Sequence, residues 1–329
     1  MNRPGPSRPV GGSQGTPPPT SVPRLGMHVS IAGGMVRMAE RARDFGCEAV
    51  QIFSRSPQGG KARAIPLEEA LAARDVLDAA GVRPLVIHMP YFANLSSGDD
   101  GLRAYAAETL TGEFERASVL GAPYVVTHPG RPAEGTGTSE GIERALTSIV
   151  EAYDRASPAA REVTLLLENT AGSGRELGAT LEDLAALLHR LEDEKGPLFG
   201  VCLDTCHAHA AGYDLSSPEG VSAFIRQAAD IVGQDRLKVI HANDSAQDAG
   251  SHKDRHAPIG SGTIGETGFS ALLATPALAG CPFLLETPGS DEERAADLRR
   301  LRLLRAELGS ESSPGVKTRQ KTARGGETQ

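Results

Sequence analysis

The 329-residue chain has no tryptophan, few aromatic residues (4%) and only four cysteines. Its core must therefore be packed from leucine, valine, isoleucine and alanine, and a hydrophobic content of 39% allows a sizeable one. No apolar run approaches the length of a membrane span, and the N-terminus lacks the apolar centre of a secretory signal. The irregularly placed cysteines form no disulfide framework. We therefore expect a protein of the reducing cytoplasm with no membrane partner.

The charge balance is acidic. The formal net charge is −8 at pH 7, which by itself argues against a nucleic-acid partner, because proteins that bind nucleic acids usually carry a basic surface. Bound divalent cations could reverse the sign locally, since an ion is often the largest charge in a site. The composition therefore leaves open a metal-dependent site for a phosphate group.

Composition also divides the chain into a long central part and two tails. Residues 1–23 are rich in proline, glycine and serine, and residues 309–329 are similar but more basic. Both segments are predicted to be disordered, because neither has enough large apolar residues to form a core. The remaining residues, 24–308, have the length of a typical single (β/α)8 domain.

Short apolar runs recur along the central part and are typical of buried parallel strands. They are LGMHVS (25–30), AVQIFS (49–54), PLVIHMP (84–90), YVVTHPG (124–130), TLLLENT (164–170), FGVCLDT (199–205), LKVIHAND (237–244) and PFLLETPG (282–289). Helical patterns such as MVRMAERARDFG and SDEERAADLRRLRLL lie between the runs. Alternating strands and helices predict an α/β fold, a (β/α)8 TIM barrel. A doubly wound open sheet is the main alternative, but no GxGxxG follows the first strand.

Polar residues stand at or near the end of seven of these runs. In chain order they are His28, His88, His128, Glu168, Asp204, His241 and Glu286, with His207 just after the sixth run and Asp254, Arg255 and His256 in the loop after the seventh. The C-terminal ends of all strands of a parallel barrel open at the same face, where active sites lie. The barrel prediction thus brings residues spread over most of the chain to one mouth.

A single histidine near a strand end is most often a packed or hydrogen-bonded residue without a function. That explanation would have to hold here for six of the nine histidines at once, because only His189, His209 and His252 lie outside the pattern. His189 belongs to a helical segment and is expected at the surface or at a helix end. We therefore favour a functional site for the rest.

The residue types favour a metal. Imidazole nitrogens and carboxylate oxygens without thiolates suit Zn²⁺, Mn²⁺ or Fe²⁺. The carboxylates Glu168, Asp204, Asp254 and Glu286 would repel one another unless cations lay between them. With about four ligands for each Zn²⁺ and some bridging, these side chains could hold two or three ions. Such a site can activate water and stabilise a leaving oxygen, which fits phosphodiester hydrolysis best.

The stretch GVCLDTCHAHAAGYD (200–214) contains two cysteines that could suggest a haem or metal motif. The haem motif fails, because three residues separate Cys202 from Cys206 instead of two. Cys202 lies two residues before Asp204 on the same strand face, so we expect a small buried hydrophobic residue inside the barrel. Cys206 is expected to pack at the rim rather than to bind a metal.

Several motifs resemble those of one family in their order along the chain. They are MHVSIAGG (27–34), THPG (127–130), LLENTAGSG (166–174), GVCLDTCHAHAAGYD (200–214), IHANDS (240–245), DRH (254–256), GSGTIG (260–265) and LLET (284–287). Together they resemble the signatures of endonuclease IV, also called deoxyribonuclease IV or type 2 apurinic/apyrimidinic endonuclease. The resemblance covers roughly residues 25–305 and leaves out both tails.

The resemblance implies a TIM barrel with three zinc ions, although Mn²⁺ or Fe²⁺ could occupy some positions. It implies a DNA-repair enzyme that cleaves the backbone 5′ to an abasic site, leaves a 3′-hydroxyl and cleans blocked 3′ ends. Residue by residue, it implies the ligands His88, His128 and Glu168 for the first zinc, Glu168, Asp204, His241 and Glu286 for the second, and His207, Asp254 and His256 for the third. It also implies a nucleophilic hydroxide between the first two ions, oriented by Glu168 as the catalytic residue. His28 resembles a supporting residue of the mouth rather than a ligand.

The implied partner is double-stranded DNA with abasic sites or blocked 3′ ends, bound by a monomer associated with the nucleoid. Tyr91 matches an aromatic residue of the third loop that helps to hold distorted DNA, although a half-buried loop tyrosine is an equal alternative. Arg255 is placed to meet a phosphate. One loop departs from the family pattern: residues 54–66 read SRSPQGGKARAIP, where Gly59 and Gly60 replace a bulky residue that enters the DNA stack.

Sugar isomerases and epimerases of the same barrel superfamily are the main alternative function. They hold one metal with Glu, Asp, His and Glu, which Glu168, Asp204, His241 and Glu286 would satisfy equally well. A one-metal isomerase has no need of the additional residues His88, His128, His207, Asp254 and His256. A barrel that binds damaged DNA without cutting it is a third possibility, but it would require a ligand to be missing, and all are present.

Overall fold

The computed structural model describes residues 22–60 and 62–311, and these residues form a closed parallel barrel. Its strands are β1 (Leu25–His28), β2 (Ala49–Ile52), β3 (Leu85–His88), β4 (Tyr124–Thr127), β5 (Thr164–Glu168), β6 (Phe199–Asp204), β7 (Leu237–His241) and β10 (Phe283–Leu285). Neighbouring strands pair in sequence order, and β1 closes the ring by pairing with both β2 and β10. The predicted TIM barrel is confirmed, and each predicted strand is present.

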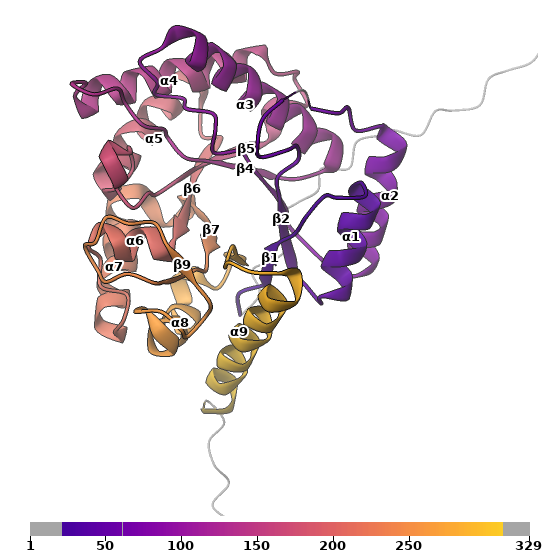
Figure 1. Cartoon of the computed structure of the whole chain (residues 1–329), viewed down its shortest axis with the longest axis vertical. Helices are drawn as coiled ribbons and strands as arrows, with labels where there is room; N and C mark the ends of the chain where they lie inside the picture. Colours follow the sequence, from indigo (N-terminus) through magenta and orange to yellow (C-terminus); the bar gives the residue numbers. More distant parts are fainter. Residues whose placement is uncertain (1–21, 61, 312–329) are drawn as a thin grey trace, which may run out of the picture.

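Helices cover the outside of the barrel and surround the strands in Figure 1. They are α1 (Met35–Asp44), α2 (Leu67–Ala79), α3 (Asp100–Leu120), α4 (Thr138–Arg155), α5 (Leu181–Lys195), α7 (Pro218–Ala228), α8 (Gly265–Ala274) and α9 (Asp291–Glu311). Local sequence sets their ends. The Asp99 carboxylate, for example, accepts a hydrogen bond from the Leu102 N–H at the start of α3, and Gly121 ends that helix with a left-handed φ of 70°.

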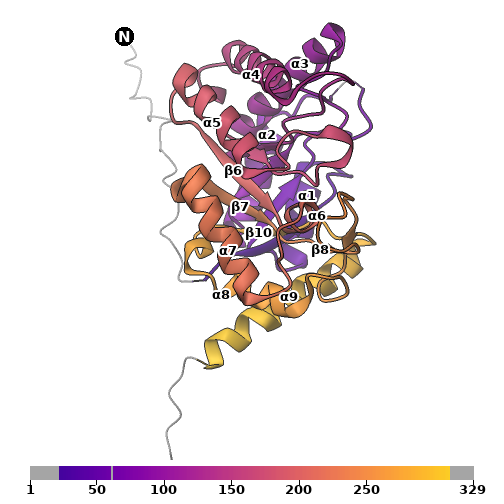
Figure 2. The same ribbon diagram turned by 90° about the vertical axis from the view of Figure 1, so that its left-hand side faces the viewer.

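The first described residues and helix α9 lie side by side at the end of the barrel where the strands begin. Helix α9 packs beside β1, below the strands in Figure 1, and Figure 2 shows it from the side. It continues to Glu311, three residues past the end of the domain predicted at 308. The rest of the predicted tails, residues 1–21 and 312–329, lies outside the described residues. No helix of the described ranges is long and apolar enough to cross a membrane.

The barrel is filled in layers, as expected when strands are buried on both faces. One apolar layer inside it consists of Ala49, Val86, Val126, Leu166, Cys202, Val239 and Leu284. A larger apolar cluster fills the space between the strands and the helices. Cys202 is completely buried in the inner layer, which confirms its expected role as a small hydrophobic residue.

Two short elements at the mouth were not expected from the sequence. Helix α6 (Thr205–Ala211) begins directly after β6. Strands β8 (Asp244–Ser245) and β9 (His256–Ala257) form a small antiparallel pair within what was predicted to be a plain loop after β7. Both elements carry residues of the predicted site.

Candidate metal centre

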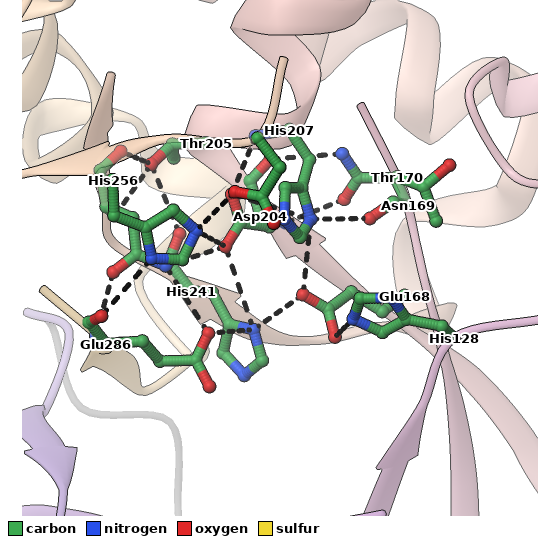
Figure 3. A network of polar contacts seen from close by, with 12 residues as sticks. His128, Glu168, Asn169, Thr170, Asp204, Thr205, His207, His241, His256 and Glu286 are labelled. Carbon is green, nitrogen blue, oxygen red and sulfur yellow. Dashed lines mark hydrogen bonds and ion pairs between the residues drawn. The ribbon is translucent and has the colours of Figure 1, made fainter. Parts of the chain in front are cut away.

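A polar layer lies directly above the inner apolar layer. Side chains alternate across a strand, so the residue two positions after each inward-facing apolar residue also faces inward. From β2 to β10 these residues are Gln51, His88, His128, Glu168, Asp204, His241 and Glu286. The register of the barrel thus brings the predicted strand-end residues together, and Figure 3 shows several of them converging.

Glu168 lies at the centre of this layer and is completely buried. Its Oε2 lies 2.9 Å from His88 Nε2 and 3.0 Å from His128 Nε2. Its Oε1 lies 2.9 Å from His241 Nδ1 and 3.4 Å from His207 Nδ1. One oxygen of the carboxylate therefore faces His88 and His128, and the other faces His241 and the Nδ1 of His207, so that Glu168 could bridge two cations held beside His88 and His128 and beside His241.

Five overlapping groups of side chains in the described chain could each hold a metal ion, because one ligand atom from every residue of a group lies within 4.8 Å of the others. Three of them have the predicted membership: His88, His128 and Glu168, then Glu168, Asp204, His241 and Glu286, and finally His207, Asp254 and His256. The other two share residues with these and are His88, His241 and Glu286, and Asp204, Cys206 and His256. The residues predicted as ligands are thus all brought together at the mouth.

The histidines of the centre are oriented by acceptors behind them. His88 Nδ1 lies 2.7 Å from the Met89 carbonyl oxygen, and His207 Nδ1 lies 2.9 Å from that of Asn169. His256 Nδ1 lies 3.2 Å from the Glu286 carbonyl oxygen. A carbonyl can only accept a hydrogen bond, so each ring keeps its proton on Nδ1 and turns the Nε2 lone pair toward the centre.

The β6–α6 junction positions two residues at once. Asp204 caps α6, and its Oδ1 accepts a hydrogen bond from the His207 N–H at 2.8 Å. Asn169 holds Asp204 from β5, because its amide oxygen accepts from the Asp204 N–H at 2.6 Å and its nitrogen donates to the Asp204 carbonyl at 3.0 Å. Asp204 and His207 thus enter different groups of the centre although they are three residues apart.

The pKa values of the centre depend on the charges of neighbouring side chains. Burial opposes charge on His207 and on His241, but the surrounding carboxylates and Cys202 outweigh it and raise both pKa values well above the ordinary value. Burial also opposes charge on Glu168, yet the charges of His241 and His128 lower its pKa well below the usual range. The carboxylates thus favour a positive charge at these rings, and a bound metal would supply that charge in place of a proton.

An unpartnered nitrogen of His256 also indicates that a metal fits these residues. His256 Nε2 is buried, faces the centre and has no hydrogen-bond partner among the described residues, which is costly for a polar atom. Its distances to Asp254 Oδ1 and Asp204 Oδ2 are 3.2 and 3.8 Å. A cation between these atoms would satisfy the nitrogen and both carboxylates together.

The centre opens into a cavity of about 730 Å³ whose lining includes His88, His128, His207 and Glu286. Tyr91 stands at its rim with 70% of its surface exposed, and its ring meets that of Phe53 edge-on at 6.2 Å. Tyr91 is therefore not the half-buried loop tyrosine of the alternative interpretation. Arg255 is exposed beside the centre, and its guanidinium donates to the Asp254 carbonyl at 2.6 Å.

The loop that departs from the family pattern borders the same cavity. Gly59 and Gly60 have φ values of 90° and 88°, a conformation that glycine adopts without strain. Arg55 donates to the Gly60 carbonyl, and Arg63 forms a 2.8 Å ion pair with Glu69. Lys61 of the same loop lies outside the described residues.

Sequence reasoning missed the residues that support the ligands. Gln51 is completely buried and contacts both His241 and Glu286. Asn243 donates to Asp204 Oδ2 at 2.6 Å and accepts from the Glu286 N–H at 2.7 Å. The inward position of Gln51, two residues after Ala49, becomes evident only from the register of the barrel. Cys206, which was expected to pack rather than to bind a metal, is fully buried, and burial raises the pKa of its thiol to about 12. Its Sγ lies within 4.8 Å of ligand atoms of Asp204 and His256.

The remaining histidines have other roles. His189 is exposed on α5, as expected. His209 is buried, and its Nδ1 accepts a hydrogen bond from the Leu215 N–H at 3.3 Å. His252 Nδ1 lies 3.1 Å from the Ala171 carbonyl oxygen and links two mouth loops. None of these three rings belongs to a candidate metal group of the described chain.

A closed barrel with clustered histidines and carboxylates at its mouth defines a class of metal-centre TIM barrels, and the sequence pattern of the Xylose isomerase-like TIM barrel family matches residues 39–306. A probable endonuclease 4 from Methanosphaerula palustris is 42% identical over 283 residues, covering 85% of this chain and 98% of its own. The crystal structure of endonuclease IV from Thermus thermophilus has a TM-score of 0.77 and 37% identity, covering 87% of this chain and 100% of that one. The chain belongs to the endonuclease IV family.

A more distant likeness concerns the fold alone. The crystal structure of a D-tagatose 3-epimerase-like protein has a TM-score of 0.66 at 18% identity and covers 88% of this chain and 100% of that one. Sugar epimerases thus share the barrel. The shared architecture does not identify a reaction, because function depends on the site built on the fold.

Proposed function

We propose that this protein is a DNA-repair endonuclease that hydrolyses the phosphodiester 5′ to abasic sites, leaves a 3′-hydroxyl and removes blocking groups from 3′ ends. Double-stranded DNA is its substrate, and it acts as a monomer. The observation that carries the proposal is Glu168, whose one buried oxygen lies against His88 and His128 and whose other oxygen lies against His241, so that the carboxylate belongs to two candidate metal groups. Such a shared carboxylate suits phosphodiester hydrolysis at a multi-metal site.

Three zinc ions are the proposed cofactor. His88, His128 and Glu168 would hold the first, Glu168, Asp204, His241 and Glu286 the second, and His207, Asp254 and His256 the third. Nitrogen and oxygen donors suit zinc, and Mn²⁺ or Fe²⁺ could occupy some positions. Three divalent ions outweigh the charge of the four carboxylates, so an acidic protein would present a cationic site to a phosphate.

When bound, the ions would act as Lewis acids and would make water acidic enough to lose a proton at neutral pH. The protein side chains do the positioning. Glu168 lies between the His88–His128 pair and the His207–His241 pair, where it can orient the attacking oxygen. Tyr91 at the rim would support the distorted duplex, and the exposed Arg255 would contact a backbone phosphate.

The single-metal isomerase is the less favoured alternative. It accounts for Glu168, Asp204, His241 and Glu286, but not for two further groups of ligand atoms within 4.8 Å of one another. Metal analysis of protein prepared without chelators separates the two functions. We expect about three equivalents, mainly zinc, and a single equivalent would contradict the trinuclear site.

The activity is tested on a duplex that carries one abasic site. We expect a single cut 5′ to that site, blocked by EDTA. Glu168→Gln should still fold and bind the duplex but should cut it at least about 10²-fold more slowly, because the amide cannot bridge two cations. Glu182→Gln, on the exposed surface of α5, is the matched control and should cut normally. Normal cutting by Glu168→Gln, or uncut DNA together with sugar turnover by the wild type, would overturn the proposal.

A further inference from the structure

Gln51 occupies the β2 position of the polar layer and is completely buried, although it is neither charged nor a candidate ligand. Its Oε1 lies 2.8 Å from His241 Nε2, and its Nε2 lies 2.6 Å from Glu286 Oε1. A neutral side chain in contact with two members of one proposed metal group calls for an explanation, because a buried amide must have its hydrogen bonds satisfied.

Only one orientation of the Gln51 amide satisfies both contacts. The Glu286 carboxylate can only accept, so the amide nitrogen of Gln51 must face it. The amide oxygen then faces His241 and can only accept the proton on Nε2. With that proton fixed, the lone pair of His241 is on Nδ1, which lies 2.9 Å from Glu168 Oε1 and 3.3 Å from Glu286 Oε2. Gln51 therefore selects the ring nitrogen that faces the carboxylates.

His28 lies beside the contact between Gln51 and Glu286. Its Nε2 accepts a hydrogen bond from the Phe53 N–H at 3.1 Å. Its Nδ1 lies 3.3 Å from the amide nitrogen of Gln51 and 3.8 Å from Glu286 Oε1. Gln51 donates to Glu286 Oε1 at 2.6 Å, whereas the other oxygen, Oε2, lies 3.3 Å from His241 Nδ1 and faces the centre.

We propose that Gln51 is a positioning residue for the second metal group: its single amide fixes the nitrogen that His241 presents and the oxygen that Glu286 presents. This inference rests on the proposed function, since it assumes that this group holds a cation. Backbone carbonyls orient His88, His207 and His256, whereas a side chain orients His241, so this support can be removed by one substitution.

The test compares Gln51→Met with the wild type. Methionine has a similar length and suits an apolar barrel interior, but it offers neither the acceptor nor the donor. The matched control is Gln234→Met, because Gln234 belongs to the short 3₁₀ turn before β7, at the end of that strand opposite His241, and donates to the Ala277 carbonyl. Thermal unfolding of the metal-free proteins shows whether each variant folds.

Metal binding is measured on chelator-stripped protein by competition between Zn²⁺ and a chromophoric chelator, and with Co²⁺ by its visible absorption. His241→Ala identifies the ion held by the second group. We expect Gln51→Met to bind that ion about 10- to 100-fold more weakly and to change its Co²⁺ spectrum, while the other equivalents and Gln234→Met match the wild type.

The outcomes separate this inference from the proposed function. Unchanged affinity and an unchanged Co²⁺ spectrum in a folded Gln51→Met variant would overturn the role of Gln51. A wild type that binds only one equivalent of metal would instead contradict the trinuclear site. The role of Gln51 could still be tested in that case, by comparing how Gln51→Met and the wild type bind the ion that is lost in His241→Ala. Equal weakening of every equivalent would also overturn it, because a general loss of structure would then explain the effect.

Discussion

At the scale of single residues, the mouth combines buried candidate ligands with exposed side chains that can contact a substrate. Phe53 packs against His28 with ring centroids 4.4 Å apart and against His88 at 5.5 Å, so it is fixed by the centre. The Tyr91 ring contacts the Phe53 ring edge-on, but most of the Tyr91 surface is exposed to solvent. Its exposure makes it a residue whose removal should affect substrate binding and not stability.

We therefore expect Tyr91→Ala to raise KM for an abasic duplex about 10-fold with little change in kcat, the effect of losing one stacking contact. Tyr91→Phe keeps the ring and should match the wild type. The melting temperature of both variants should stay unchanged, because the side chain is 70% exposed. Steady-state kinetics and thermal unfolding measure these effects; a Tyr91→Ala variant with normal KM would remove Tyr91 from the DNA contact.

At the scale of elements, the strands and their end residues could be predicted because parallel strands leave a strong apolar pattern. Asp204 and Glu286 stand out for the same reason, since each ends an apolar run. Gln51 could not be singled out, because the run AVQIFS continues past it and hides its inward direction. The β8–β9 pair is too short to leave a pattern, and long-range contacts define it.

Asp244 of β8 shows how such contacts define the mouth. Its buried Oδ1 accepts from the N–H groups of Ser245, Ile264 and Gly265, and its Oδ2 accepts from those of Gly260 and Gly262. The same strand pairs with β9, which carries His256. One carboxylate thus joins the turn after β9 to the hairpin that presents a proposed ligand.

We expect Asp244→Asn to lower the free energy of unfolding by about 2 kcal/mol, because the amide nitrogen cannot accept the hydrogen bonds that one oxygen accepts now. We also expect weaker binding of the ion near His256. Urea unfolding of the metal-free protein and zinc analysis measure the two effects. Asp248→Asn, exposed in the same loop, serves as control. Full zinc content after gentle dialysis of Asp244→Asn would contradict the second effect.

At the scale of the whole molecule, side-chain contacts hold the two ends of the described chain together. The guanidinium of Arg305 in α9 forms two 2.6 Å contacts with the Glu48 carboxylate, just before β2, and donates to the Pro23 carbonyl at 2.7 Å. The Leu25 N–H of β1 also donates to Glu48, at 3.0 Å. The last helix is thereby fastened to the first two strands, at the end of the barrel opposite the metal centre.

Burial raises the pKa of Glu48, but the Arg305 and Leu25 contacts outweigh it, so the net pKa lies below the ordinary value. A lowered folded-state pKa means that the contribution to stability is present above the unfolded value, about 4.3, and is lost as pH falls through the folded value. We expect Glu48→Gln to cost about 1 kcal/mol at pH 7, a modest figure because the pair is partly exposed. Its melting temperature should approach that of the wild type as pH falls toward about 3. Glu40→Gln, which breaks the exposed pair with Arg37, should change little at any pH. A gap between Glu48→Gln and the wild type that stays constant over this range would mean that packing, and not the charge of Glu48, fastens α9.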